Sequence, residues 1–123
     1  MTDIKCLDSS AWLLYYFYPD SSVRLMIDDM GLILTSSLSL FEIKKRLLRL
    51  KKDSEPLLTF MKQRSVIIMP TIEINEKAAE IAIQKNLGAI DALIYTTTLL
   101  HKAELVTGDN DFRGLENVKI VSA

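Results

Sequence analysis

The sequence has 123 residues, of which 15 are lysine or arginine and 16 are aspartate or glutamate, for a formal net charge of −1. This length suits one globular domain over residues 1–123 and is too short for two full domains. Hydrophobic residues make up 49% of the chain and charged residues 25%, which excludes a disordered or fibrous protein. The near-zero charge argues against binding to nucleic acid by overall electrostatic attraction, although a local basic patch can still bind it.

Cysteine and histidine are nearly absent, which limits both the compartment and the metal chemistry. Cys6 is the single cysteine and His101 the single histidine, so the chain has no internal disulfide and no His/Cys set for zinc. No apolar run approaches the roughly 20 residues that span a bilayer, and the start Met1-Thr2-Asp3 lacks the features of a signal peptide. We therefore expect a cytoplasmic protein with no membrane association, in which Cys6 and His101 have structural roles.

Short runs rich in β-branched and apolar residues alternate along the chain with segments of helical periodicity. The predicted strands are Ile4–Leu7, Leu32–Thr35, Val66–Met69, Leu105–Thr107 and Val118–Val121. The predicted helices, two after each of the first three strands, are Ala11–Tyr18, Ser22–Met30, Leu40–Lys52, Glu55–Arg64, Asn75–Leu87 and Ala89–Lys102. Because parallel strands need long connections, which helices supply, this order predicts an α/β fold with a mainly parallel sheet covered on both faces. Asn75 is the expected N-cap of the fifth helix and Gly88 its expected stop.

Four carboxylates stand at the ends of these elements. Asp8 follows the first strand, and Asp109 follows the fourth. Glu42 lies in the first turn of the helix after the second strand, and Asp91 begins the helix after Gly88. Ligands of open α/β sheets bind outside the carboxyl ends of the strands, so acids from several ends can meet in one cleft. Such acids repel one another and need a cation, and oxygen ligands without His or Cys suit Mg²⁺ or Mn²⁺.

Each of these acids also has a purely structural explanation. Asp8 suits an N-cap, and Ser39-x-x-Glu42 matches a capping box. Asp91 gains from the dipole of its helix, and Asp109 suits a turn. Singly, each acid is weak support for a site. Their joint placement favours a metal site, because unrelated caps need not share one end of the sheet.

The stretches that carry these acids match the pattern of a known family. They are Ile4-Lys5-Cys6-Leu7-Asp8-Ser9-Ser10, Thr35-Ser36-Ser37-Leu38-Ser39-Leu40-Phe41-Glu42-Ile43, Ile90-Asp91-Ala92-Leu93-Ile94 and Leu105-Val106-Thr107-Gly108-Asp109-Asn110-Asp111-Phe112. Over nearly its whole length the chain resembles the PIN domain family, most closely the VapC-type ribonuclease toxins of toxin–antitoxin pairs. The resemblance implies a three-layer α/β/α fold with a five-stranded sheet of order 3-2-1-4-5, an order that the residue spacing does not determine.

The resemblance also implies a site and an activity. The implied catalytic and metal-binding acids are Asp8, Glu42, Asp91 and Asp109, with Asp111 as a candidate fifth carboxylate and Ser9 and Thr107 as nearby hydroxyls. We expect Asp8, Asp91 and Asp109 to hold a first ion of Mg²⁺ or Mn²⁺, which would support hydrolysis of RNA phosphodiester bonds. The expected role is the toxin of a type II pair, with RNA as substrate and a cognate antitoxin as partner. The alternative is a non-toxin PIN-domain protein in RNA processing or RNA binding, with weak nuclease activity.

The helix that holds Glu42 has a basic side. On a helical wheel, Glu42 lies opposite the apolar stripe, together with Lys45, Arg46 and Arg49. These three residues are candidates for binding the backbone of an RNA strand. The alternative is a solvated helix face, in which Arg46 pairs with Glu42 one turn earlier and nearby acids pair with the remaining bases.

Aromatic residues cluster directly after Asp8, at Trp12, Tyr15, Tyr16, Phe17 and Tyr18. We expect most of them in the core, since a small sheet needs large side chains to cover it. Because the run is apolar nearly all round, part of it is expected to be buried against a second copy, in a homodimer, or against an antitoxin.

Two other α/β classes with acids at strand ends are disfavoured. A phosphoryl-accepting receiver domain needs an aspartate directly after the third strand, where this chain has Pro70-Thr71. A haloacid-dehalogenase-type phosphatase needs Asp-x-Asp after the first strand, and Asp8-Ser9-Ser10 lacks the second acid.

Overall fold

A five-stranded parallel sheet forms the centre of the computed structural model, which describes residues 4–123. The strands are β1 (Lys5–Leu7), β2 (Ile33–Ser36), β3 (Val66–Ile68), β4 (Glu104–Thr107) and β5 (Val118–Ile120). Their order is β3-β2-β1-β4-β5, and every neighbouring pair is parallel. The predicted α/β class and the strand order 3-2-1-4-5 are therefore confirmed. The start Met1-Thr2-Asp3 lies outside the described residues.

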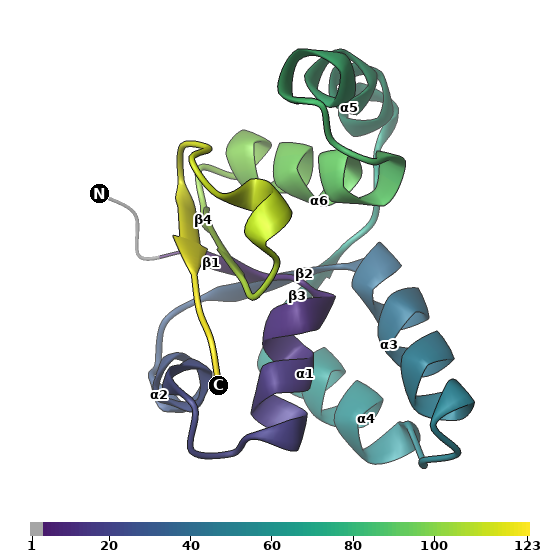
Figure 1. Ribbon diagram of the computed structural model, residues 1–123, viewed down its shortest axis with the longest axis vertical. Coiled ribbons are helices and arrows are strands. Elements are labelled where there is room, and N and C mark those ends of the chain that lie inside the picture. The colour runs from purple at the N-terminus through teal and green to yellow at the C-terminus, as the bar shows by residue number, and fades with distance from the viewer. Residues whose placement is uncertain (1–3) are drawn as a thin grey trace.

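Helices cover both faces of the sheet. They are α1 (Ser9–Phe17), α2 (Ser22–Asp28), α3 (Ser37–Arg49), α4 (Glu55–Arg64), α5 (Ile72–Lys85), α6 (Ala89–Leu100) and the short 3₁₀ helix η1 (Asn110–Phe112). Figure 1 shows α1 to α4 on one side of the sheet and α5, α6 and η1 on the other, which gives the three predicted layers. No helix within residues 4–123 is long and apolar enough to cross a membrane.

Successive strand residues face opposite sides of the sheet and fill two separate cores. In β1, Cys6 packs into the core under α5 and α6, whereas Leu7 packs into the core under α1 to α4. In β4, Leu105 and Val106 divide between the two cores in the same way. Because both faces of a parallel sheet are covered by helices, functional groups gather at its ends, where loops leave the strands.

Strands β1 and β4 lie side by side at the centre of the sheet. From β1 the chain winds outward to β2 and β3, and from β4 it winds in the opposite direction to β5. The strand order therefore reverses between β1 and β4, which is where open α/β sheets bind ligands. Asp8 directly follows β1 and Asp109 lies two residues after β4, so the topology brings both acids to this switch point.

Two predictions about the ends of α5 are wrong, because other residues cap this helix. It begins at Ile72 with Thr71 as its N-cap, and Asn75 lies inside the first turns. It ends at Lys85, and its C-cap Asn86 adopts the left-handed conformation that commonly terminates a helix. Gly88, the expected stop, is instead the N-cap of α6.

Helix α3 also begins earlier than predicted, which changes the setting of Glu42. The predicted start is Leu40, whereas the helix begins at Ser37, and the side chain of Ser36 caps it. The predicted capping box of Ser39 and Glu42 is therefore wrong, and Glu42 lies in the second turn rather than the first.

The aromatic cluster on α1 is less buried than predicted. Only Trp12 is fully buried; Tyr15 and Tyr16 are half-buried, and Phe17 and Tyr18 are exposed. Consecutive residues of a helix point in directions about 100° apart, so a nine-residue helix with one buried face cannot bury them all. Trp12 belongs to the core, and Tyr15 and Tyr16 pack against it, so three of the five rings contact the core and Phe17 and Tyr18 do not.

Candidate metal centre

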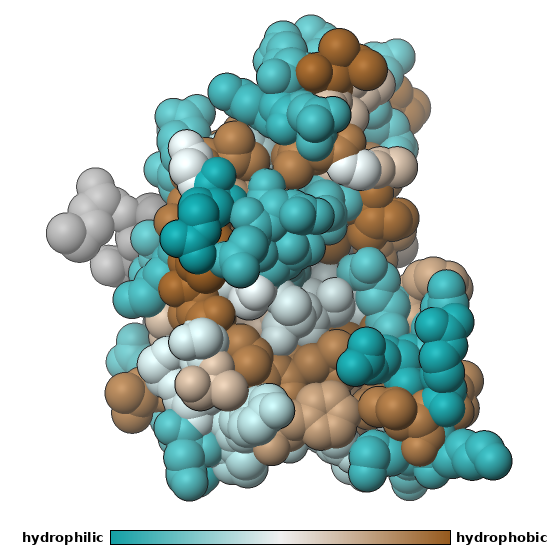
Figure 2. Space-filling view, in the orientation of Figure 1, coloured by the Kyte–Doolittle hydropathy of each residue, from teal (hydrophilic) through white to brown (hydrophobic). Residues whose placement is uncertain are grey.

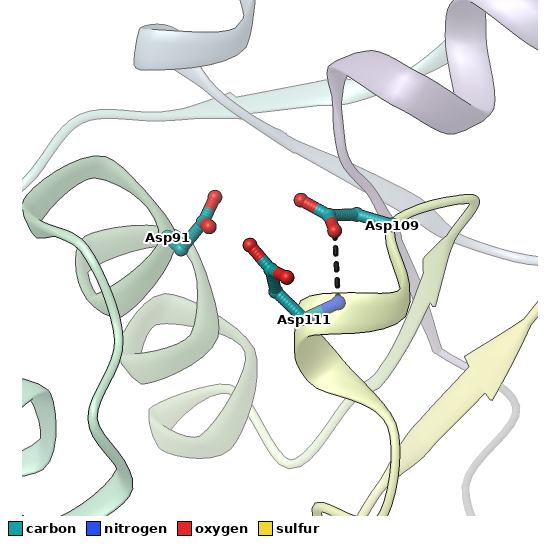
Figure 3. Close-up of side chains that lie close together, drawn as sticks. All are labelled: Asp91, Asp109 and Asp111. Atoms are coloured by element: carbon teal, nitrogen blue, oxygen red, sulfur yellow. Dashed lines mark hydrogen bonds between the residues drawn. The ribbon is translucent and has the colours of Figure 1, made fainter.

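Three carboxylates from two distant segments converge at the carboxyl edge of the sheet. They belong to Asp91, Asp109 and Asp111, and Figure 3 shows their side chains pointing toward one another. Each offers one oxygen, and these three oxygens lie within 4.8 Å of one another. That spacing is close to the roughly 4 Å across the oxygen shell of Mg²⁺. The group can therefore hold one divalent cation after small side-chain rotations.

The turn after β4 supplies two of the three acids. It folds into η1, with Asp109 as its N-cap, and the backbone N–H of Asp111 donates to Asp109 Oδ1 at 2.8 Å. This local bond holds both carboxylates on one side of the turn. Phe112 anchors η1, since its ring is fully buried 6.2 Å from the ring of Tyr95 on α6. The same packing contact holds η1 against the helix that provides Asp91.

Asp8 lies at the switch point and is only 5% exposed. Its Oδ1 accepts from the Ser10 hydroxyl at 2.6 Å and from the Ala11 N–H at 3.0 Å, and its Oδ2 accepts from the Thr107 hydroxyl at 2.5 Å. The bond to Ala11 is an N-cap bond, so Asp8 also has the structural role considered for it. Burial raises the pKa of Asp8 most, and the charge of Asp109 raises it further, while the three hydrogen bonds act in the opposite direction.

Ser10 joins these segments and was not singled out by the sequence. Its Oγ donates to Asp8, accepts from the Gly108 N–H at 2.8 Å and lies 3.1 Å from Thr107 Oγ1. Thr107 Oγ1 in turn accepts from the Asp109 N–H at 3.0 Å. Each hydroxyl has one hydrogen, which it donates to Asp8. Its oxygen lone pairs are then free to accept hydrogen bonds from backbone N–H groups of the turn. The two hydroxyls therefore tie Asp8 to the loop that carries Asp109.

Glu42 reaches this region from α3. Its Oε1 accepts from the Ser9 hydroxyl at 3.0 Å, so Ser9, a predicted nearby hydroxyl, supports Glu42. Arg46, one turn further along α3, forms no ion pair with any residue of the described chain. The Glu42–Arg46 pair of the structural alternative is therefore not formed, and Glu42 is bound to the start of α1.

Asp91 shows that the five carboxylates share one electrostatic environment. Partial burial raises the pKa of Asp91 most, and the negative charges of Asp109, Asp8, Glu42 and Asp111 raise it further, to about 6. A divalent cation would stabilise the ionised acids and offset the repulsion between them. Carboxylate and hydroxyl oxygens are the donors that Mg²⁺ and Mn²⁺ prefer, so the donor set fits the predicted cofactor.

The arrangement of the acids differs in detail from the expected one. Asp8 was expected to hold an ion together with Asp91 and Asp109, whereas the tight group contains Asp111 in its place. Both carboxylate oxygens of Asp8 accept hydrogen bonds, as the outer-shell support of a metal-binding carboxylate does. Asp8 and Glu42 flank the group closely enough to act on the pKa of Asp91.

The three candidate RNA-binding residues Lys45, Arg46 and Arg49 are exposed on α3. Together with Glu42 they line one cleft. Lys44, on the same helix, instead lies 3.6 Å from Glu55 of α4. Lys44 is paired as the solvated-face alternative describes, and the other three bases are exposed in the cleft that Glu42 also lines.

The fold and the site can be compared with known proteins. A sequence model of the PIN domain matches residues 5–118. No curated protein sequence gives a significant match. A toxin–antitoxin complex from Klebsiella pneumoniae has a TM-score of 0.79 at 18% identity, covering 94% of this chain and 95% of that chain. VapBC2 from Rickettsia felis, bound to a DNA fragment from its promoter, has a TM-score of 0.76 at 23% identity, and the match covers 97% of this chain and 99% of that chain.

A third similar structure is VapC20 of Mycobacterium tuberculosis, described as a toxin that cleaves the sarcin–ricin loop. Its TM-score is 0.77 at 17% identity, covering 96% of this chain and 99% of that chain. Similarity at this level of identity shows a shared fold, and the match over residues 5–118 shows the family. The chain belongs to the PIN domain family.

Proposed function

We propose that this protein is an endoribonuclease that hydrolyses RNA phosphodiester bonds and depends on Mg²⁺ or Mn²⁺. The observation that carries the proposal is the gathering of carboxylates around Asp91, from α3, from the end of β1 and from the turn that forms η1. Partial burial and these charges together raise the pKa of Asp91 to about 6. Negative charges brought together in this way are unfavourable without a cation. Helix capping explains Asp8, but it does not explain why the side chains of Asp91 and Asp111 approach Asp109.

The proposal assigns a role to each acid. Asp91, Asp109 and Asp111 would hold the metal ion, which when bound supplies an activated water and stabilises charge on the phosphate and the leaving oxygen. Asp8 closes the inner wall of the site, and its hydrogen bonds to two hydroxyls keep the carboxylate from rotating away. Glu42, held by the Ser9 hydroxyl, would orient a water or a second ion from the opposite side.

We further propose that the protein acts as the toxin of a type II toxin–antitoxin pair. The similar structures that support this are named as a toxin–antitoxin complex, as VapBC2 and as VapC20, and each is covered over almost its full length. Exposed Phe17, the last residue of α1, and its neighbour Tyr18 line a groove of about 360 Å³ that reaches Ser10 and Gly108. This groove is where we expect the antitoxin or a second copy of the chain to bury the aromatic segment. The homodimer and the cytoplasmic location remain predictions.

The test of the nuclease compares the wild type with Asp91→Asn and a matched control, Asp20→Asn, which makes the same chemical change at an exposed acid. With Mn²⁺, we expect the wild type and Asp20→Asn to cut a labelled RNA equally fast, and Asp91→Asn to be slower by at least about 100-fold. EDTA should stop the reaction. Equal rates for Asp91→Asn and the wild type, after identical purification, would contradict the proposal and indicate a contaminating nuclease.

Expression in bacteria tests the toxin role separately. We expect growth arrest with the wild type and normal growth with Asp91→Asn, and we expect co-expression of a cognate antitoxin to relieve the arrest. Cleavage of RNA without any growth arrest would favour a protein of RNA processing over a toxin.

A further inference from the structure

A cleft between α3 and α6 opens directly beside the proposed metal centre. It has a volume of about 290 Å³ and is lined by Phe41, Glu42, Lys45, Arg46, Arg49 and Ile90. Glu42 is one of the five acids, and Ile90 directly precedes another, Asp91. Figure 2 shows hydrophilic side chains over η1 and the adjoining end of α6, and a second hydrophilic group along α3. A ligand in the cleft would therefore have one end at the carboxylates.

The cations of the cleft form no close ion pair with the acids of the described chain. Within residues 4–123, Lys45, Arg46 and Arg49 form no ion pair, whereas Lys44 pairs with Glu55. Arg46 has the spacing to pair with Glu42, but the Glu42 carboxylate is bound to Ser9. Three cations without ion pairs beside a metal centre suit a polyanion such as a nucleic-acid strand. One phosphate of the strand would enter the metal centre, and the cations would bind the phosphates next to it.

Phe41 adds an aromatic face to the same cleft. Its side chain is 64% exposed, and Lys45 Nζ lies 5.9 Å from the ring centroid. The cation–π contact keeps an ammonium group next to the ring without covering the whole of it. An exposed ring beside cations is the arrangement with which proteins bind unpaired nucleotides, because the base stacks on the ring while the cations contact the backbone.

We infer that this cleft is a subsite for one nucleotide of single-stranded RNA adjacent to the cleaved phosphate. Its base stacks on Phe41, and its phosphate is bound by Lys45, Arg46 and Arg49. The inference rests on the proposed nuclease function and specifies the form of its substrate. Bases inside a duplex are stacked on one another and cannot reach the ring, so the substrate is unpaired at this position.

A peptide segment is the competing occupant. Phe41 also lines a more apolar groove of about 660 Å³ between α3 and α4, together with Leu40, Leu48 and Leu58. The cleft beside Glu42 differs from this groove because it contains three unpaired cations and lies against the acids. Its charge therefore favours the anionic strand, and the peptide is an outcome that the experiment can detect.

The experiment measures the affinity for a fluorescent single-stranded RNA in Ca²⁺, with a gel to show that the RNA stays intact. Phe41→Ala should weaken binding about 5- to 100-fold, with an unchanged dependence on salt. Lys45→Ala should weaken binding and lower the slope of log affinity against log salt by about 0.7. The matched control is Leu48→Ala, which removes an apolar side chain of similar exposure, 58%, from the same helix but outside this cleft. It should bind RNA as the wild type does.

The outcomes separate this inference from the proposed function. If the wild type cuts RNA and Phe41→Ala binds the strand as tightly as Leu48→Ala does, the subsite is wrong and the nuclease stands. If Phe41→Ala and Leu48→Ala both lose a co-expressed antitoxin while RNA affinity is unchanged, the surface belongs to a protein partner and the subsite is overturned. If binding depends on Phe41 but the wild type cuts no RNA in Mn²⁺, the nuclease is wrong, and the cleft is a binding site for single-stranded RNA without a cleaved phosphate beside it.

Discussion

Replacing Thr107 with valine tests whether buried hydroxyls, and not only carboxylates, hold the site together. Thr107 is fully buried at the end of β4. Its Oγ1 donates to Asp8 Oδ2 at 2.5 Å and accepts from the Asp109 N–H at 3.0 Å. Valine has nearly the same shape but no donor or acceptor, so the substitution keeps the packing and removes both hydrogen bonds.

The expected loss of stability follows from these two bonds. A hydrogen bond to a charged group contributes about 1.5–3 kcal/mol and a neutral one about 1 kcal/mol. Within residues 4–123, Asp8 Oδ2 has no other hydrogen-bond donor. We therefore expect Thr107→Val to lower the free energy of unfolding by about 2–4 kcal/mol.

Thr96 offers a matched control. It is as fully buried as Thr107, and its hydroxyl has no hydrogen-bond partner among the described residues. Thr96→Val makes the same chemical change but removes a buried polar group that is unpaired. The free energy of unfolding of Thr96→Val should therefore lie between about 0.5 kcal/mol below and about 1 kcal/mol above that of the wild type.

Urea denaturation measures both variants, with the emission of Trp12 as the probe. Trp12 is the single tryptophan and is fully buried, so its emission reports unfolding. Thr107→Val should also bind Mn²⁺ about 10- to 100-fold more weakly, because Asp8 and Asp109 lose a shared support. If Thr107→Val and Thr96→Val unfold at the same urea concentration, the hydroxyl network contributes no stability and our account of Asp8 is wrong.

Two further predictions concern charge and backbone conformation. In EDTA, the folded chain keeps the proton of Asp91 up to a pKa of about 6, above the ordinary value of 3.8, so the free energy of unfolding should fall as pH rises from about 4 to 6. We expect a fall of roughly 1–2 kcal/mol after allowance for solvent screening. Asp91→Asn should reduce this fall without abolishing it, because the pKa of Asp8 is also raised by burial, and it should gain no stability from Mn²⁺ at pH 7.5. Urea midpoints that rise over this range in the wild type would contradict the reasoning. Asn86 has φ 54°, so Asn86→Ala should lower stability by about 1 kcal/mol while Asn86→Gly should not, and equal melting temperatures for these two variants would refute this.

Periodicity and element order were sufficient to predict the fold class. Strand runs alternate with helical segments, and each βα unit is specified by residues close together in the chain. The position of an acid relative to the end of a strand is also a local feature, which is why Asp8 and Asp109 could be placed at one edge of the sheet before the structure was known. Strand order is different, since it depends on which neighbours the crossovers reach, and it was predicted only from the family resemblance.

Local patterns misplaced helix ends where two residues could serve as a cap. Thr71 and Asn75 both suit an N-cap. Ile72, the first residue of the helix, is exposed and does not belong to the buried apolar face whose periodicity predicts a helix. For a related reason, the sequence did not show which rings of the aromatic run after Asp8 would be left exposed. The composition of the run indicates burial, but the number of rings that α1 can bury depends on how much of its surface packs against the sheet and the neighbouring helices.

The sequence alone therefore determined an α/β chain with acids at the ends of its strands and a basic helix near one of them. Only the tertiary structure decided which acids approach most closely, that Asp111 joins Asp91 and Asp109, and that Ser10 links Asp8 to the opposite loop. The physical reason is distance along the chain: Asp8 and Thr107 are 99 residues apart and yet share a hydrogen bond. Such a bond depends on β1 and β4 lying side by side, and no local pattern of residues encodes it.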